Sequence, residues 1–225
     1  MHNAVLSKQV FDFLIDLEKN NNREWFDAHK TTFKTLEAQV KEKFEAISVA
    51  LSSHDELSKT KLFRVYRDVR FSKDKTPYKA HFAGSFTRAG AALRGGYYIH
   101  LKPNSSFIAA GFWAPDKNDL FRIRKEWEMD SSELRDILAE KKFKGVWGEL
   151  EGEELKTAPK GFDKEDPNID LIRKKQFIFS RKLTDNEVMS PEFIHNVAEY
   201  FSAIRPFFDL MSDILTTDIN GQSLL

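Results

Sequence analysis

Cysteine is absent from this chain of 225 residues. Without thiols the protein cannot form disulfides, use a cysteine nucleophile, or hold an iron–sulfur cluster or a cysteine-bound zinc ion. Long apolar runs are missing too, and no segment approaches the ~20 consecutive apolar residues that cross a bilayer. The first nine residues lack the apolar core of a secretory signal. These absences predict a soluble protein of the reducing cytoplasm.

The motifs of the common catalytic machineries are also missing. The chain has no GxSxG nucleophile motif, no P-loop, no dinucleotide-binding glycine fingerprint and no HExxH zinc motif. We therefore expect neither a bound cofactor nor a metal. Lysine plus arginine and aspartate plus glutamate number 35 each, so the formal net charge is zero. A neutral chain does not adhere as a whole to nucleic acid or to an anionic membrane.

Aromatic residues, in contrast, are abundant. Phenylalanine alone occurs 20 times, and 41% of the residues are hydrophobic. A chain of this length buries roughly 70% of the surface that its unfolded form exposes, so its core needs no disulfide or metal. No repeat, linker or low-complexity tract divides the sequence. We therefore expect one domain over residues 1–225.

Helical periodicity dominates both ends of the chain. Apolar residues recur every three or four positions after Ser7 and again over residues 23–51, with the asparagines at 20–22 as a break and a fresh N-cap. A serine–proline pair at 190–191 favours the start of a last helix. We expect that helix to kink at Pro206, because proline disrupts a helix interior.

The middle of the chain alternates apolar and polar residues, which is typical of half-buried strands. The strands predicted from this pattern span residues 62–71, 81–87, 97–102, 107–113 and 177–183. Short turns join the first four. The predicted fold class is therefore α+β, with an antiparallel β-meander packed against N-terminal and C-terminal helices.

Basic residues concentrate around the first predicted strand. Residues 61–81 contain seven lysines and arginines against two aspartates, a local excess of five positive charges. Arg64 and Arg70 fall on the polar face of that strand, from which both can fork onto a carboxylate or phosphate. Lys73 and Lys75 on the following turn can complete an anion cradle. The ligand-binding residues predicted in this segment are Arg64, Arg67, Arg70, Lys73, Lys75, Tyr78 and Lys79.

An alternative interpretation of the same segment stays open. Arg67 points with the apolar residues, and a guanidinium in that position needs a carboxylate or backbone carbonyls to offset its desolvation. The cations can also form a solvated face in which Asp68 and Asp74 neutralise them internally.

Two of the six histidines carry the prediction of proton-transfer chemistry. His81 and His100 fall on one predicted sheet face with Ser85, Tyr98 and Lys102. A histidine there, beside the basic segment, can act as a general acid or base. The competing interpretation is a hydrogen-bonded or solvent-facing histidine with no catalytic role. No carboxylate accompanies the pair at a spacing that would favour a metal.

Several longer runs, taken together, resemble one known family. The runs are NNREWF at 21–26, RVYRDVRFSKDKTPYK at 64–79, GYYIHL at 96–101, AGFW at 110–113 and PKGFD at 159–163. Their order resembles the bacterial and fungal family called domain of unknown function 2461, over residues 11–208. The resemblance implies an α+β domain, and it supplies no substrate or catalytic residue to transfer.

Function is therefore predicted from the residues alone. The leading prediction is a domain that binds a phosphorylated or carboxylated small molecule at the basic segment, with Tyr78 and Trp113 as walls. A second is an enzyme acting on a phosphoester or another anionic substrate through His81 or His100. A third is a module that docks an acidic protein or, less favoured, a nucleic acid. We expect no membrane partner, and the sequence leaves the oligomeric state open.

Overall fold

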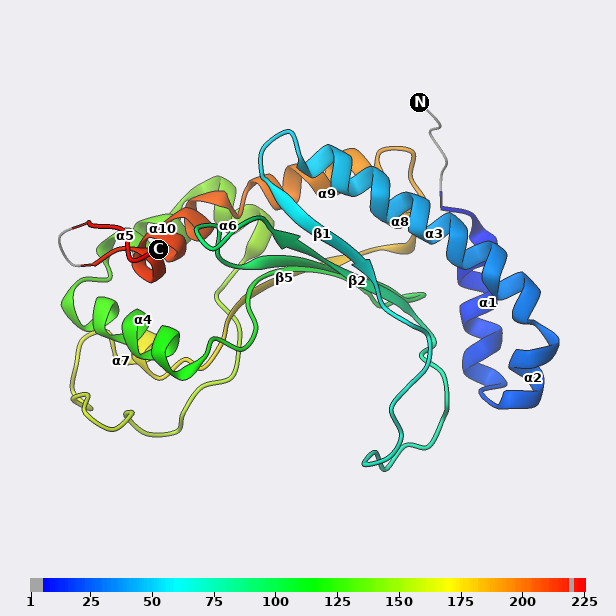
Figure 1. The fold of residues 1–225 in the computed structure, drawn as a ribbon, viewed down its shortest axis with the longest axis horizontal. Coiled ribbons are helices and arrows are strands. Elements are labelled where there is room, and N and C mark those ends of the chain that lie inside the picture. Colours follow the sequence, from blue (N-terminus) through cyan, green and yellow to red (C-terminus); the bar gives the residue numbers. More distant parts are fainter. Residues whose placement is uncertain (1–5, 219–220) are drawn as a thin grey trace. The chain divides into compact units, whose positions relative to one another are not determined.

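A computed structural model describes residues 6–218 and 221–225 of the chain (Figure 1). Its sheet has five strands in the order β1-β2-β3-β4-β5, which is also their order along the chain. The strands are β1 (Leu57–Leu62), β2 (Phe82–Arg88), β3 (Gly96–Leu101), β4 (Ser106–Phe112) and β5 (Phe177–Leu183). The fold class is α+β with an antiparallel meander, as predicted.

Helices precede, interrupt and follow the sheet. They are α1 (Lys8–Lys19), α2 (Arg23–Ala28), α3 (Lys30–Leu51), α4 (Lys117–Met129), α5 (Ser132–Ala139), α6 (Lys141–Trp147), α7 (Ile169–Ile172), α8 (Asp185–Val188), α9 (Phe193–Ser202) and α10 (Arg205–Thr216). The segment between β4 and β5, which carries α4 to α7, is the longest connection within the meander.

The chain forms two compact units. Unit 1 contains residues 1–86, 98–108 and 182–199, and unit 2 contains residues 87–97, 109–181 and 200–225. Strands β2 to β5 each contribute residues to both units.

Unit 1 packs the N-terminal helices against one face of its strands. Helix α3 contacts β1, and Phe33 and Phe44 of α3 stack on Phe82 and Phe86 of β2 with ring centroids 5.8 and 5.6 Å apart. Residues of α1 complete this core, which is almost fully removed from solvent. The opposite face of these strands, which we call the outer face, carries side chains that remain half-exposed.

Unit 2 has an aromatic core of its own. Phe207 of α10 lies edge-on to Phe112 of β4 and Phe179 of β5, with centroids 5.9 and 5.0 Å apart. Tyr97 packs on Phe201 with centroids 4.7 Å apart. Such edge-to-face pairs are the preferred geometry of aromatic rings and add to the free energy of burial. The C-terminal helices therefore pack on the sheet as predicted.

Both terminal helical regions differ from prediction in one detail. The predicted helix over residues 23–51 is two helices, because the chain breaks at His29 between α2 and α3. Asn22 caps α2 as expected, with its side chain accepting a hydrogen bond from the Trp25 amide. At the C-terminal end the expected kink is a full break, after which Pro206 lies in the first turn of α10.

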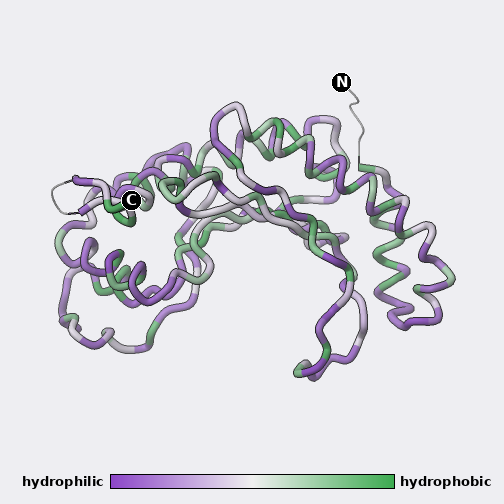
Figure 2. Tube along the Cα trace, in the orientation of Figure 1, coloured by the Kyte–Doolittle hydropathy of each residue, from purple (hydrophilic) through white to green (hydrophobic). Residues whose placement is uncertain are grey.

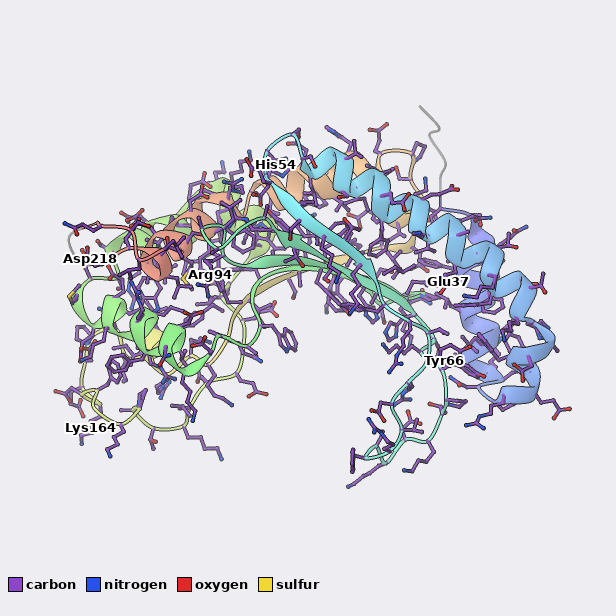
Figure 3. The ribbon with its side chains drawn as sticks, viewed as in Figure 1. Glu37, His54, Tyr66, Arg94, Lys164 and Asp218 are labelled. Carbon is purple, nitrogen blue, oxygen red and sulfur yellow. The ribbon has the colours of Figure 1, made fainter. Side chains whose placement is uncertain are left out.

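The strand predicted over residues 62–71 is wrong. Strand β1 ends at Leu62, and residues 63–81 form a long irregular hairpin that leads to β2 and that we call the 63–81 hairpin (Figure 1). Its arms are joined by an isolated bridge between Tyr66 and Tyr78, labelled at Tyr66 in Figure 3. The alternating pattern does not form a strand here because no second layer packs on the apolar residues of this segment. Val65 is buried, but Phe71 is 96% exposed. Figure 2 shows the hairpin as largely hydrophilic with a short hydrophobic stretch at its tip.

Candidate anion-binding site

The base of the 63–81 hairpin packs against α2 and the α1–α2 connection. The Tyr78 ring is buried and stacks on Phe26 of α2 at a centroid distance of 4.0 Å. The Asn21 side chain donates a hydrogen bond to the Tyr78 carbonyl at 2.9 Å and accepts one from the Tyr78 amide at 3.1 Å. The Lys79 amide donates to the Val65 carbonyl across the hairpin at 2.8 Å. These contacts fix where the residues that follow Tyr78 lie.

A hollow of about 540 Å³ opens beside this base, entirely within unit 1, and we call it the unit 1 hollow. Its lining comes from the end of α1, the α1–α2 connection, the hairpin and the residue after β3. The lining residues are Glu18, Asn21, Arg67, Asp68, Asp74, Thr76, Lys79, Ala80, His81 and Lys102. Three cations and three carboxylates therefore face one small volume.

Two of the three cations are already paired. Arg67 forms an ion pair with Asp74 and also donates to the Thr76 hydroxyl. The hydrogen bond from Arg67 is the main reason that the pKa of Asp74 falls to about 2. Lys102 forms an ion pair with Glu18, with its ammonium nitrogen 2.7 Å from the carboxylate oxygen. The carboxylate that the sequence predicted for Arg67 is thus present.

Lys79 is the third cation, and its charge is not neutralised. Its ammonium group makes no ion pair with any residue in the part of the chain that the structure describes. The remaining carboxylate, Asp68, is bound by Arg70, which lies outside the lining. Burial lowers the pKa of Lys79, and the positive charges of Arg64 and Arg67 lower it further. An anion placed in the hollow would relieve both effects.

Of the two predicted histidines, His81 lines the hollow and His100 contacts His81. The rings of His81 and His100 lie with centroids 4.1 Å apart. Burial lowers the pKa of both imidazoles to about 4, and His81 is affected further by His100, Lys79 and Lys102. The Nδ1 atom of His100 is 3.2 Å from the Tyr98 hydroxyl. Both rings are therefore uncharged at neutral pH, and each keeps one nitrogen that can accept a proton or hydrogen bond.

Several of the predicted binding residues do not line the hollow. Arg70 turns back onto Asp68, with its Nε and Nη2 atoms 2.9 and 2.6 Å from the carboxylate oxygens. Lys75 donates to the Val69 carbonyl at 2.9 Å. Arg64 and Lys73 are exposed on the hairpin. Because residues 63–71 are no strand, Arg64 and Arg70 do not share the regular face that the alternation predicted.

The two predicted walls also lie elsewhere. Tyr78 is buried at the hairpin base against Phe26 and is not among the residues that line the hollow. Trp113 belongs to unit 2 and is 71% exposed. The predicted residues that the structure brings together are thus Arg67, Lys79 and His81, with His100 directly behind His81.

Sequence reasoning missed the acidic and amide side of the hollow. Glu18 lines the hollow from α1, and Asn21 lines it from the α1–α2 connection. Lys102 lies 84 positions along the chain from its ion-pair partner Glu18. Lys102 was identified only as a neighbour of the histidines on the sheet face. No local pattern marks such a pair, because the contact exists only after the helices pack on the sheet.

Residues 6–218 and 221–225 contain neither a metal-binding cluster nor a membrane-spanning helix. No group of three or more histidine, aspartate or glutamate side chains in this part of the chain is arranged to hold a metal ion. No helix in it has the length and apolar content needed to cross a membrane.

Comparison with known proteins identifies a family for this chain. The family model described as conserved hypothetical protein (DUF2461) matches residues 9–210, close to the 11–208 span predicted from the sequence runs. No curated protein and no solved structure matches the chain. The family description names no activity.

Proposed function

The chain belongs to the DUF2461 family of conserved hypothetical proteins, and we propose that it binds an anionic small molecule, phosphorylated or carboxylated, in the unit 1 hollow. The observation that carries this proposal is Lys79, which lines the hollow and whose ammonium group forms no ion pair with a carboxylate of the described residues. The three ion pairs around it leave this one positive charge in excess. We also propose a cytoplasmic location, with which a chain without cysteine is compatible.

The chemistry of the hollow fits an anion better than a cation or an apolar ligand. A bound anion offsets the hydration free energy that a partly buried ammonium group loses. The Asn21 amide is already committed to Tyr78, so His81 is the neutral hydrogen-bonding group best placed to orient the ligand. Arg67 and Lys102 can share their remaining donors with the same anion, since each has more N–H groups than its ion pair uses.

Calorimetric titration with inorganic phosphate, acetate and small sugar phosphates tests this proposal. Lys79→Met keeps the length of the side chain but removes its charge. Loss of one charge-assisted hydrogen bond, ~1.5–3 kcal/mol, should weaken binding roughly 10- to 100-fold. The matched control is Lys73→Met on the exposed part of the same hairpin, which should change affinity less than about twofold. Equal effects of the two substitutions would show that only diffuse charge on the hairpin attracts the anion.

The neutral histidine pair favours a second candidate, an enzyme acting on a phosphoester or another anionic substrate. A neutral imidazole beside a bound anion can take a proton from an attacking nucleophile. If the protein is such an enzyme, His81→Ala or His100→Ala abolishes turnover of phosphoester substrates while the protein stays folded. Turnover that survives both substitutions in folded protein would remove this candidate.

The tip of the 63–81 hairpin favours a third candidate, the docking of an acidic macromolecule. Phe71 is 96% exposed, and Arg70 beside it is 76% exposed in its side chain. Exposed aromatic and arginine side chains are common anchors at interfaces. This function is supported if the protein captures a macromolecule, if salt weakens the capture, and if Arg64→Glu and Lys75→Glu abolish it. Capture that these charge reversals leave unchanged opposes it.

A further inference from the structure

We propose that the ligand of the unit 1 hollow carries two negative charges, as a phosphomonoester or a dicarboxylate does, and that Lys102 leaves Glu18 to bind the second charge. This inference rests on the proposed anion-binding function. It specifies the class of ligand and names Glu18 as a residue that selects it. It follows from a difference between the ion pairs that surround the hollow.

Two ammonium groups approach the hollow from different elements. Lys79 belongs to the end of the 63–81 hairpin, and Lys102 directly follows β3. His81 lines the same hollow, and the positive charges of both lysines lower the pKa of its imidazole. Both ammonium groups therefore lie within electrostatic range of one ring. A ligand that carries two negative charges can contact the two lysines together.

The ion pair between Lys102 and Glu18 is weak. Its charged atoms lie 2.7 Å apart, but the Glu18 side chain keeps 56% of its surface exposed to water. Such a pair contributes little to stability, because water solvates the separated charges almost as well as they solvate one another. Lys102 can therefore exchange Glu18 for a ligand at small cost, and the Glu18 carboxylate returns to solvent.

Arg67, the other paired cation of the lining, is held more firmly. It pairs with Asp74 and also donates to the Thr76 hydroxyl. Asp74 in turn accepts hydrogen bonds from the Thr76 amide at 3.0 Å and from the Thr76 hydroxyl at 2.8 Å. Moving Arg67 onto a ligand would break this network, in which each bond supports the others. Lys102 is therefore the cation that changes partner.

Glu18 acts as an internal competitor for the ligand. While Glu18 holds Lys102, the ammonium group of Lys79 remains for the ligand, and this one charge matches a monoanion. A dianion gains a second charge-assisted hydrogen bond when Lys102 changes partner. The exchange therefore favours ligands with two negative charges over ligands with one.

Calorimetric titration at pH ~7.5 with methyl phosphate and dimethyl phosphate tests this inference. The two probes share a phosphoryl core. Methyl phosphate is a dianion at this pH, since the second pKa of a phosphomonoester is about 6, whereas dimethyl phosphate is a monoanion. We expect wild-type protein to bind methyl phosphate about tenfold or more tightly. Lys102→Met should remove most of that preference and leave the affinity for dimethyl phosphate within about twofold.

Glu18→Gln removes the internal competitor. The affinity for methyl phosphate should then rise about two- to fivefold, which is the effect of losing an exposed ion pair. Glu37→Gln is the matched control, because it removes the carboxylate of another lysine pair. Glu37, labelled in Figure 3, pairs with Lys34 on α3 and does not line the hollow. This variant should keep both affinities within about 1.5-fold of wild type.

The outcomes separate this inference from the proposed function. Three results overturn the exchange of Lys102 and leave anion binding at Lys79 intact: equal affinity for the two probes, a preference that survives Lys102→Met, or a Glu18→Gln affinity no higher than that of Glu37→Gln. If neither probe binds, or if Lys79→Met leaves both affinities unchanged, the anion site itself is wrong and the inference falls with it. A preference for the dianion that needs Lys102 and grows in Glu18→Gln supports the full proposal.

Discussion

Lys79, His81 and His100 illustrate how neighbours set the protonation of single residues. Burial disfavours the charged form of each, and the nearby cations act in the same direction. Lys79 and His81 were predictable as a pair from sequence, because they lie two positions apart in a basic segment. The ion pairs that leave Lys79 alone were predictable only in part: Asp68 and Asp74 are local, but Glu18 comes from a distant helix.

The histidine pair should make stability depend on pH. The folded pKa of both groups, about 4, lies below the usual value of about 6.5. The unfolded chain therefore binds more protons between these pH values, so stability is fully present above pH ~6.5 and is lost as the pH falls toward 4. On going from pH 7 to pH 5, the melting temperature of wild-type protein should fall ~2–4 °C further than that of the His81→Gln/His100→Gln variant. That difference corresponds to ~1 kcal/mol at this chain length, reduced from the full effect because both rings are half-exposed.

Thermal melts followed by circular dichroism at both pH values measure this difference. His195→Gln, on the exposed surface of α9, is the matched control and should behave as wild type. Parallel pH profiles for wild type and the double variant would show that the two rings titrate normally in the folded protein.

At the scale of elements, prediction succeeded where packing follows the local pattern. Strands β2, β3 and β4 begin and end within one residue of the predicted bounds, and β5 matches its predicted bounds. In β2, β3 and β4 every second residue is buried, so the period of two in the sequence reflects a real core face. The 62–71 segment has the same period but no layer to pack on, and only tertiary structure reveals that.

Asn21 should be essential for anchoring the 63–81 hairpin. Asn21→Ala leaves the amide and the carbonyl of Tyr78 without their side-chain partner, at a cost of ~1–3 kcal/mol. Urea unfolding measures the lost stability, and hydrogen exchange should show a less protected Tyr78 amide. Asn20→Ala is the control, since among the described residues the Asn20 side chain bonds only to the Asp16 carbonyl at the end of α1. Equal stabilities of the two variants would contradict the anchoring role.

Substitution of Gly84 tests how closely β2 packs against β1 and α3. A Cβ atom at this position would overlap the Lys61 carbonyl oxygen and the Phe44 ring. Gly84→Ala should therefore destabilise the protein by ~1–3 kcal/mol, the usual cost of overpacking a core. Gly145→Ala is the opposite case: Gly145 lies in α6 with open space around it, and alanine there should stabilise by ~0.5–1 kcal/mol. Chemical denaturation that ranks Gly84→Ala at or above wild type would refute this packing.

For the whole molecule, the family and the fold class were both predictable from the sequence. The long specific sequence runs made the family predictable. The succession of helical, alternating and helical segments made the α+β architecture predictable. The site was predictable only as a basic segment with two histidines nearby. Its actual lining depends on which charges neutralise one another, and that is decided by the packing of α1, the hairpin and β3 within unit 1.

Crystals grown with tungstate, a heavy analogue of phosphate, provide the most direct measurement of the central claim. Anomalous scattering then locates each bound anion without ambiguity. We expect a tungstate ion in the unit 1 hollow, within hydrogen-bond reach of the Lys79 ammonium group, and its loss in Lys79→Met crystals. Tungstate bound only along the exposed cations of the hairpin, with the hollow containing solvent alone, would contradict it.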